Sequence, residues 1–537
     1  MTGIAWHLAG ATEAVTRNPP VPTKVAPQPA SLGGATGAAS AVAPLKPPVK
    51  LRAPLVQPPV AQLPLAQPPV ATPAPQPERR IIRVGLSTRG APIAFWSPAA
   101  LTITDTAQPG RRLVVPAGAR VAFAVDLPVA ITEGAQRWSG AIQVQLDGKV
   151  SRAWKSVLVT PASTATRIST NGSNPRWERA YRGSFEIAGQ NFSFEPDTHR
   201  GGLRLVNIVA LEDYLKGVVP WEMTPSAPLE ALKAQAICAR SETLAKINGG
   251  RHSADGYDIC DYDHCQGYSG TENEKPSSSR AVEQTAGLAI FYRGRVADAV
   301  YGTNSGGITA SSADVWRGPA KPYLRGVRDY SLARHNAAAH LVKDNMSEDD
   351  WVRYCTQNVA TYAQPSSAQT RELAARRLAS PRAAALFQAD DLPEFYRWTR
   401  VVTPHSLAQA MSRWIKIDTV TEMRVLDRAE SGHIKRLLVR GAARGEEATW
   451  TFEGDSQIRA ILSGRLGSTT ALPSSTFVVL PQRDAKGVVT AFVLKGAGWG
   501  HGVGMCQRGA QNHAREGWTA RQIIQFYFRD VELRKVD

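Results

Sequence analysis

Cysteines are few in this chain, five in 537 residues, and they are spread from Cys238 to Cys506. Such an odd and sparse set argues against a framework of disulfide bonds. Long apolar runs are missing as well, because no stretch approaches the roughly 20 apolar residues that a membrane-spanning helix needs. Residues 1–17 lack the basic-then-apolar profile of a secretory signal, since His7 and Gly10 interrupt the apolar run. The sequence therefore shows neither a transmembrane helix nor an apparent signal peptide.

The charge balance is basic. The 63 Lys and Arg residues exceed the 46 Asp and Glu residues, which gives a formal net charge of +17. This charge favours polyanionic partners, such as nucleic acid, anionic lipid or an acidic cell wall. The basic residues are scattered, and no block of Lys and Arg is interleaved with aromatic residues. We therefore do not expect nucleic acid as a partner.

Prolines cluster near the N-terminus. Residues 18–77 consist mostly of Pro, Ala, Val, Gln and Leu without a helical or strand period. A segment of this composition cannot build a packed core. We expect residues 1–78 to form a disordered Pro/Ala-rich spacer.

Beyond this spacer, strand patterns and helix patterns occupy separate stretches. We expect short strands between residues 79 and 207, helices at 210–247, strands at 289–300 and 423–494, and a closing helix at 517–528. This order predicts an α+β fold, with antiparallel strands and a few helices in a two-domain catalytic region. We divide this region into a first part at 79–331, a helical insert at 332–380 and a C-terminal part at 381–537.

The predicted helices at 210–247 are interrupted by Pro220, Pro225 and Pro228. A proline inside a helix removes a backbone donor and clashes with the preceding turn. We therefore expect two helices joined by an irregular bend, with Glu222 in the bend.

Glu222 is the first candidate for chemistry. Its apolar neighbours in the sequence are Val218, Val219, Trp221 and Met223. Burial among such groups raises the pKa of a carboxyl, which keeps it protonated and able to act as an acid near neutral pH. A helix-capping or exposed glutamate is the alternative. Glu212 and Asp213 are expected on a solvated helix face.

Lys233 and Arg240 lie seven positions apart in the second helix and so share one face. They could bind a polar or anionic sugar substituent, or they could orient Glu222. Simple solvation of both side chains is the alternative.

A loop rich in metal-binding side chains follows. Residues 251–266 contain two cysteines, two histidines and four aspartates. Thiolate and imidazole are ligands that zinc prefers, so a metal site is one prediction. Two free thiols, or a disulfide between Cys260 and Cys265, are the alternatives.

Glycine occupies every even position from 496 to 504. In an extended chain this spacing leaves one side bare and puts Trp499, His501 and Val503 on the other. A polymer or a neighbouring strand could then approach the bare backbone. A dinucleotide-binding fingerprint is rejected, because too little chain follows for a βαβ unit.

Two further features concern substrate binding. Ser305 lies in a Ser-Gly-Gly turn without the elbow motif of hydrolases, so a turn is favoured over a nucleophile. Flat apolar side chains could act as platforms for sugar rings, although buried core is the default for each of them. The candidates are Trp221, Tyr268, Trp316 and Trp499.

These segments together resemble the family of the stage II sporulation protein D and the amidase enhancer. The matching motifs occur in family order: 206–223 (VNIVALEDYLKGVVPWEM), 229–240 (LEALKAQAICAR), 257–268, 304–307 (NSGG) and 498–510 (GWGHGVGMCQRGA). The resemblance covers roughly residues 79–528 and leaves out the N-terminal spacer.

The resemblance implies a lytic transglycosylase of the cell envelope. Such an enzyme cleaves the β-1,4 bond between N-acetylmuramic acid and N-acetylglucosamine of peptidoglycan and leaves a 1,6-anhydro end. In the sporulation branch, the substrate is glycan stripped of stem peptides. Glu222 matches the catalytic glutamate, and Lys233 and Arg240 match basic positions implicated in activity.

The resemblance also implies ligands. Family members that hold zinc through one histidine and two cysteines imply His252, Cys260 and Cys265 here, with His264 as an alternative ligand. The residues expected to contact the glycan are Trp221, Tyr268, Ser305, Trp499 and His501. The rival interpretation is a non-enzymatic wall-binding protein that stimulates an N-acetylmuramoyl-L-alanine amidase, because the family's other namesake is an enhancer.

Overall fold

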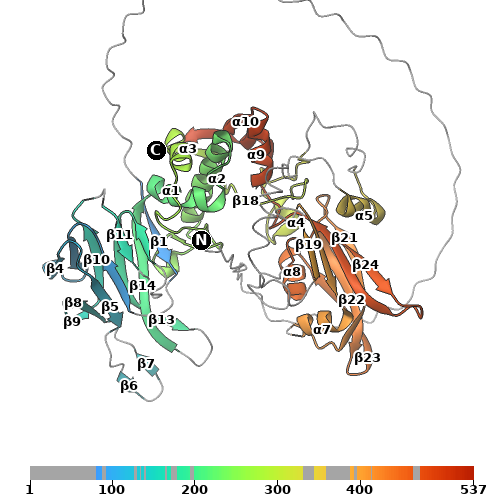
Figure 1. Cartoon of the computed structure of the whole chain (residues 1–537), viewed down its shortest axis with the longest axis horizontal. Coiled ribbons are helices and arrows are strands. Elements are labelled where there is room, and N and C mark those ends of the chain that lie inside the picture. The colour runs from blue at the N-terminus through green and yellow to red at the C-terminus, as the bar shows by residue number, and fades with distance from the viewer. Residues whose placement is uncertain are drawn as a thin grey trace, which may run out of the picture. The chain divides into compact units, whose positions relative to one another are not determined.

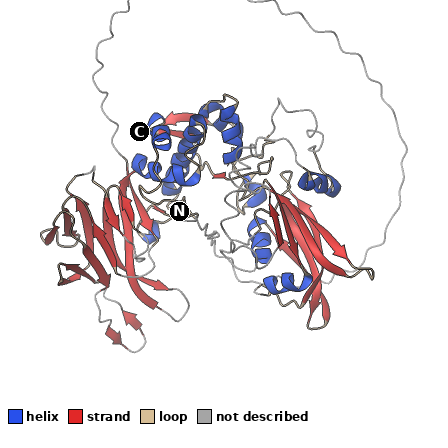
Figure 2. Cartoon of the chain, viewed as in Figure 1, coloured by secondary structure: helices blue, strands red, loops and turns tan. Residues whose placement is uncertain are grey.

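The chain is represented by a computed structural model. It describes residues 80–87, 92–125, 130–132, 135–137, 141–163, 166–170, 178–193, 199–329, 344–357, 388–391, 396–412, 414–463 and 472–536. The predicted spacer at residues 1–78 lies outside the described residues. The structure combines helices with larger sheets whose strand pairs are antiparallel apart from one short parallel pair (Figures 1 and 2), so the predicted α+β class is confirmed. No helix in the described ranges is long and apolar enough to span a membrane.

Two sheets near the start of the described chain share one hydrophobic core. The first has the order β15-β1-β14-β13-β10-β3-β4 and the second β12-β11-β2-β5-β8-β9. Burial alternates along strands such as β3 and β5, as expected for strands with one face toward a core. Phe95 of β2 meets Phe185 of β13 with ring centroids 4.9 Å apart, so the two sheets pack face to face.

The strands of the first sheet are β1 (Ile81–Leu86), β3 (Leu101–Asp105), β4 (Arg112–Val115), β10 (Ser156–Pro161), β13 (Ser184–Ser193), β14 (His199–Ala210) and β15 (Ile259–Cys260). Those of the second are β2 (Ile93–Trp96), β5 (Val121–Val125), β8 (Ile142–Leu146), β9 (Lys149–Trp154), β11 (Ile168–Thr170) and β12 (Arg179–Tyr181). A separate hairpin pairs β6 (Ala130–Thr132) with β7 (Ala135–Arg137). The strands expected in this part of the sequence are therefore present.

Strand β14 leads directly into helix α1 (Leu211–Glu222), and α2 (Leu229–Asn248) follows after a short connection. The two predicted helices are confirmed, but the bend is shorter than expected. Helix α1 continues through Pro220 and ends at Glu222, so the prediction that Glu222 lies in the bend was wrong: it is the last residue of the helix. The backbone N–H of Met223 donates to the Val219 carbonyl at 2.9 Å and closes this end.

Helix α2 is the centre of the helical block. Thirteen of its 20 residues are buried. A helix buried on most sides needs small side chains, which accounts for its many alanines. It packs against α1, α3 (Pro276–Gln284), β16 (Leu288–Tyr292), α9 (Gln507–Arg515) and α10 (Ala520–Tyr527). Gln235 of α2 and Gln507 of α9 are hydrogen-bonded at 3.2 Å across 272 positions of sequence, so the end of the chain lies beside α2 (Figure 1).

The C-terminal part of the sequence closes this block. Strand β27 (Glu532–Lys535) pairs with β16, which also pairs with β17 (Arg295–Val296). The prediction of a strand up to residue 300 was wrong beyond Val296, because residues 297–300 are not part of a strand. Helix α10 confirms the closing helix, whereas α9 was not expected.

A second hydrophobic core involves residues 398–494. Its sheets have the orders β19-β20-β25-β24 and β21-β22-β23. The elements are β19 (Gln388–Asp391), β20 (Arg397–Val402), α7 (Pro404–Met411), β21 (Thr419–Arg428), β22 (Ile434–Ala443), β23 (Glu446–Glu453), α8 (Asp455–Ser463), β24 (Phe477–Arg483) and β25 (Val489–Ala497). Strands are thus confirmed at 423–494. Of the expected insert at 332–380, residues 344–357 are described, and they contain α5 (Glu348–Thr356).

A buried polar cluster ties the loop before residue 330 to the last two helices. Asp329 accepts a hydrogen bond from the Tyr527 hydroxyl at 2.9 Å and pairs with His513 Nε2 at 3.2 Å. Asp329 and His513 have fully buried side chains. A buried carboxylate needs such partners, because leaving one without them is costly.

We predict that Tyr527→Phe destabilises the protein by about 1–3 kcal/mol, because Asp329 loses a buried donor. Unfolding by urea, followed by circular dichroism, measures the change. Tyr292→Phe on half-buried Tyr292 is the control and should be close to neutral. Equal stabilities of the two variants would contradict a stabilising role for this cluster.

Candidate active site and metal centre

Glu222 is the last residue of α1 and is half-buried. Its apolar sequence neighbours Val218, Val219 and Met223 are buried, as expected. The backbone N–H of Gly267 donates a hydrogen bond to Glu222 Oε1 at 2.9 Å. The carboxyl group is therefore fixed from a loop 45 positions further along the chain.

Burial raises the pKa of Glu222 to about 8. The Gly267 hydrogen bond and the charge of Lys246 act in the opposite direction, whereas the negative charges of Glu242 and Asp263 raise the pKa further. Glu222 is thus mainly protonated at neutral pH, which is the state that a general acid requires.

Gly267 can approach Glu222 only because it has no side chain. A Cβ atom at this position would overlap the indole ring of Trp221. Sequence reasoning missed Gly267, although it directly follows the Cys/His loop. Trp221 therefore packs against the backbone that holds Glu222. Its role as a platform for a sugar ring stays a prediction.

The Cys/His loop forms a four-residue cluster. The ligand atoms of His252, Cys260, His264 and Cys265 all lie within 4.8 Å of one another. His252 Nε2 is 3.4 Å from Cys265 Sγ and 3.2 Å from His264 Nδ1. The structure thus brings together the three predicted metal ligands and also the alternative ligand His264.

This donor set fits zinc, since two thiolates and two imidazoles are a common tetrahedral combination. The carboxylate of Asp255 lies 2.7 Å from His252 Nδ1. Such a contact leaves Nε2 free to bind a metal and is usual for metal-binding histidines. Cys260 and Cys265 are free thiols, so the structure does not contain the disulfide that was considered as an alternative.

Arg240 lies inside the helical block, with no exposed side-chain surface. Its guanidinium binds both carboxylate oxygens of Glu212, at 2.8 and 2.6 Å, and donates to the Leu288 carbonyl at 2.9 Å. Arg240 therefore links α1, α2 and β16. The sequence suggested a solvated helix face for Glu212. Its side chain is 35% exposed, but Arg240 and the Gly287 N–H also hold it.

Lys233 is half-buried on α2 and pairs with Glu230 at 2.7 Å. It does not share the environment of Arg240, although the two residues are seven positions apart. Other elements cover most of α2, and they bury Arg240 but not Lys233. Two residues on the same face of this helix therefore differ in exposure.

The glycine-rich segment is not extended. Its glycines at 498, 500, 502 and 504 have φ angles of 84°, 101°, 69° and 77°. These angles lie in the left-handed region, which is unfavourable for residues with a Cβ atom. The expectation of a strand with one bare side was therefore wrong, and the glycines instead allow a sequence of tight turns.

These turns do permit the close backbone approach that was expected. A Cβ at Gly498 would collide with the Asn304 and Ser305 backbone, and one at Gly504 with the Val300 carbonyl. Strand β18 (Tyr301–Gly302) runs parallel to β26 (Met505–Cys506). The neighbour that approaches the glycine backbone is thus the Ser-Gly-Gly turn at Ser305.

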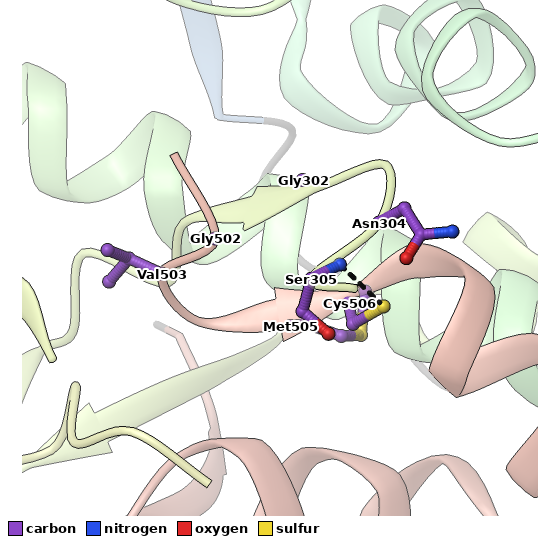
Figure 3. A pocket seen from close by; sticks show the side chains of 7 residues that line it. All are labelled: Gly302, Asn304, Ser305, Gly502, Val503, Met505 and Cys506. Carbon is purple, nitrogen blue, oxygen red and sulfur yellow. Dashed lines mark hydrogen bonds between the residues drawn. The ribbon is translucent and has the colours of Figure 1, made fainter. Parts of the chain in front are cut away.

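A small pocket lies at this junction. It is a narrow crevice of about 150 Å³ that includes open solvent and is too tight to hold a water molecule. Figure 3 shows its lining residues: Gly302, Asn304, Ser305, Gly502, Val503, Met505 and Cys506. The Ser305 N–H donates to Cys506 Sγ at 3.4 Å. Ser305 Oγ accepts from the Gly307 N–H at 3.3 Å, as expected for a turn.

Two predicted glycan-binding residues lie beside this pocket. The backbone of Trp499 bonds to the Asn304 carbonyl at 2.7 Å, and the His501 ring faces Gly302. Burial lowers the pKa of His501 to about 4, so its ring is neutral at pH 7. Tyr301, which precedes Gly302, has a buried hydroxyl without a hydrogen-bond partner among the described residues.

Tyr268 lies in the core. It is 2% exposed, its hydroxyl donates to Asn207 Oδ1 at 2.9 Å, and its ring packs on Tyr214 with centroids 4.8 Å apart. In this environment Tyr268 supports the loop that carries Gly267. It is not available as an open sugar platform in this conformation.

The fold and site define an α+β protein with a half-buried, protonated glutamate beside a Cys/His cluster. The family model described as Stage II sporulation protein matches residues 199–292, which include both features. A second model, described as a domain of unknown function (DUF8618), matches residues 310–504.

Relatives agree with the first match. The amidase enhancer of Bacillus subtilis is 27% identical over 337 residues, which are 59% of this chain and 40% of that protein. The stage II sporulation protein D of B. subtilis is 23% identical over 63% of this chain and 78% of its own. An uncharacterized protein of Brachyspira hyodysenteriae is 26% identical over 61% of this chain and 68% of its own. Residues 199–292 thus resemble the stage II sporulation protein family, and the chain as a whole is similar to proteins named amidase enhancer and stage II sporulation protein D.

We predict that Gly267→Ala displaces Trp221 and the N–H that binds Glu222. Overpacking of this kind costs about 1–3 kcal/mol. Tryptophan fluorescence and the melting temperature measure the change. Gly110→Ala is the matched control, because a Cβ there meets no atom within 4 Å. A Gly267→Ala variant that melts and fluoresces like the control would show that the site has room for a side chain.

Proposed function

We propose that this protein is a peptidoglycan lytic transglycosylase with Glu222 as its acid and base. The observation that carries the proposal is a half-buried carboxyl, held by the Gly267 N–H, whose pKa of about 8 keeps it protonated at neutral pH. Similarity to the amidase enhancer and to stage II sporulation protein D supports a role on the cell wall, and the net charge of +17 suits an acidic wall polymer.

The mechanism needs only one carboxyl group. Glu222 donates its proton to the glycosidic oxygen, and the bond from that oxygen to the anomeric carbon of N-acetylmuramic acid breaks. The 6-hydroxyl of the same sugar then attacks the anomeric carbon and gives its proton to Glu222. A 1,6-anhydro ring forms, Glu222 is protonated again, and no water is consumed.

Tyr301 on β18 supports the proposed role of Glu222. The charge of Glu222 acts on Tyr301, so the phenol lies near the acid, and burial keeps the pKa of Tyr301 well above its usual value. A neutral, buried phenol without a hydrogen-bond partner among the described residues is a donor that ionised Glu222 could use. Trp221, Ser305, Trp499 and His501 are the residues that we propose to contact the glycan.

Arg240 and Lys233 take different proposed roles. Arg240 holds Glu212 at the start of α1, the helix that ends at Glu222, and so positions the acid. Lys233 is half-buried, and we propose that it contacts the substrate after release from Glu230.

The rival function is a non-enzymatic enhancer of an amidase. The name of the B. subtilis relative supports it, but the match covers only 40% of that protein. The protonated state of Glu222 favours the enzyme, because a binding surface has no need of a carboxyl whose pKa is raised to about 8. In either case we propose a location in the cell envelope.

We predict that Glu222→Gln lowers the release of 1,6-anhydro ends by about 100-fold or more. The full chain is incubated with purified glycan strands, with and without stem peptides, and the products are identified by mass. The substituted amide still offers an oxygen to the Gly267 N–H, so the fold should persist. Glu283→Gln is the control, because Glu283 is 60% exposed and pairs with Lys216 on the protein surface.

The same assay has an expected pH dependence. The protonated acid is the active form, so the wild-type rate should be retained below about pH 8 and lost as the pH rises through the pKa of Glu222. If the wild type releases no ends at any pH but stimulates an added amidase, the transglycosylase proposal fails and the enhancer is supported.

We also propose that His252, Cys260, His264 and Cys265 hold one structural zinc ion. Bound zinc would cross-link the loop that ends at Gly267, and four protein ligands leave no open position for water. Asp255 would fix the His252 ring.

We predict one zinc per chain by elemental analysis of the purified protein. His264→Ala and Cys265→Ser should lose it, and Asp255→Asn should weaken binding about 10- to 100-fold in competition with a chelator. His405→Ala serves as the control. If His264→Ala keeps full affinity, the site uses only the three ligands implied by the family.

A further inference from the structure

Helix α2 carries a buried ion pair that faces the Cys/His loop. Glu242 Oε1 and Lys246 Nζ are 2.6 Å apart, and their side chains are only 9% and 10% exposed. A buried ion pair is a weak source of stability, because both charges lose their hydration. Its other contacts therefore indicate what it does.

Both members of the pair bind the loop just before Gly267. Lys246 Nζ donates to the Cys265 carbonyl at 2.6 Å, and Gln266 Nε2 donates to Glu242 Oε2 at 3.0 Å. Gln266 also donates to the Ala239 carbonyl at 3.0 Å. The next residue donates its N–H to Glu222. Residues 265–267 are thus attached in succession to α2 and then to the acid at the end of α1.

The pair also places charge near Glu222. The negative charge of Glu242 raises the pKa of Glu222 and the positive charge of Lys246 lowers it, with Glu242 the stronger of the two. The other charged group that acts on the acid is Asp263 in the loop, which raises the pKa. Glu222 in turn raises the pKa of the Tyr301 phenol on β18. Burial of Glu222 itself remains the main cause of its raised pKa.

We infer that Glu242 is a positioning residue for Glu222: together with Lys246 and Gln266 it holds residues 265–267 against α2 and sets the charge that the acid meets. The chemical consequence rests on the proposed transglycosylase function. The physical consequence, the state of the Glu222 carboxyl, does not.

The experiment therefore reads Glu222 directly. Full-length protein is labelled with ¹³C in the glutamate carboxyl groups, and its NMR spectrum is recorded against pH without substrate. The Glu222 signal is assigned by its absence in Glu222→Gln. Three variants are compared with the wild type: Glu242→Gln, the double variant Glu242→Gln/Lys246→Met, and Glu283→Gln as a matched control on a surface ion pair.

Glu242→Gln should lower the midpoint of Glu222 by about one pH unit, because it removes a negative charge and leaves Lys246 uncompensated. The double variant should show a smaller decrease, since both charges and their opposing effects are gone. Glu283→Gln should leave the midpoint unchanged. Melting temperatures of all variants show that the fold is retained, and the double variant keeps the test valid if Glu242→Gln alone is unstable.

An unchanged Glu222 midpoint in both Glu242 variants would overturn the inference. Equal decreases in the single and double variants would overturn the charge effect, since Lys246 would then not matter. Where the wild type releases anhydro ends, the alkaline limit of that rate should move with the NMR midpoint, with little change in KM. Absence of release in the wild type would reject the proposed function alone, because the titration would still be measured.

Discussion

The hydrogen bond from the Gly267 N–H to Glu222 is the constraint on which the site depends. It joins the end of helix α1 to the loop around Gly267, which forms neither a helix nor a strand. Contacts lie on both sides of it: Arg240 binds Glu212 at the start of α1, and the Glu242–Lys246 pair binds residues 265 and 266 of the loop.

This arrangement also explains how the carboxyl can be fixed and still be protonated. A hydrogen bond from a backbone N–H favours the charged form of a carboxyl group and lowers its pKa. By itself it would therefore leave Glu222 ionised at neutral pH. Burial works against it and is the larger effect, and the nearby carboxylates Glu242 and Asp263 add to burial. A single backbone donor thus orients the group without determining its charge.

The sequence predicted the fold class, the two helices around Glu222 and most strands, because these depend on local periodicity and on proline. It also predicted three of the four clustered Cys and His residues and named the fourth as an alternative. It could not predict the role of Glu212, Gln266 or Gly267. Their roles come from contacts 24 to 75 positions apart, which no local pattern contains.

The glycine-rich segment shows why a correct pattern can give a wrong conformation. Alternating glycine fits both an extended strand with one bare side and a chain of left-handed turns, because each requires the absence of a Cβ atom at every second residue. The choice depends on what approaches the segment. Here the backbone at Val300, Asn304 and Ser305 occupies the space of the missing side chains, so tertiary packing selects the turns and forms the small pocket beside Tyr301 from two distant parts of the chain.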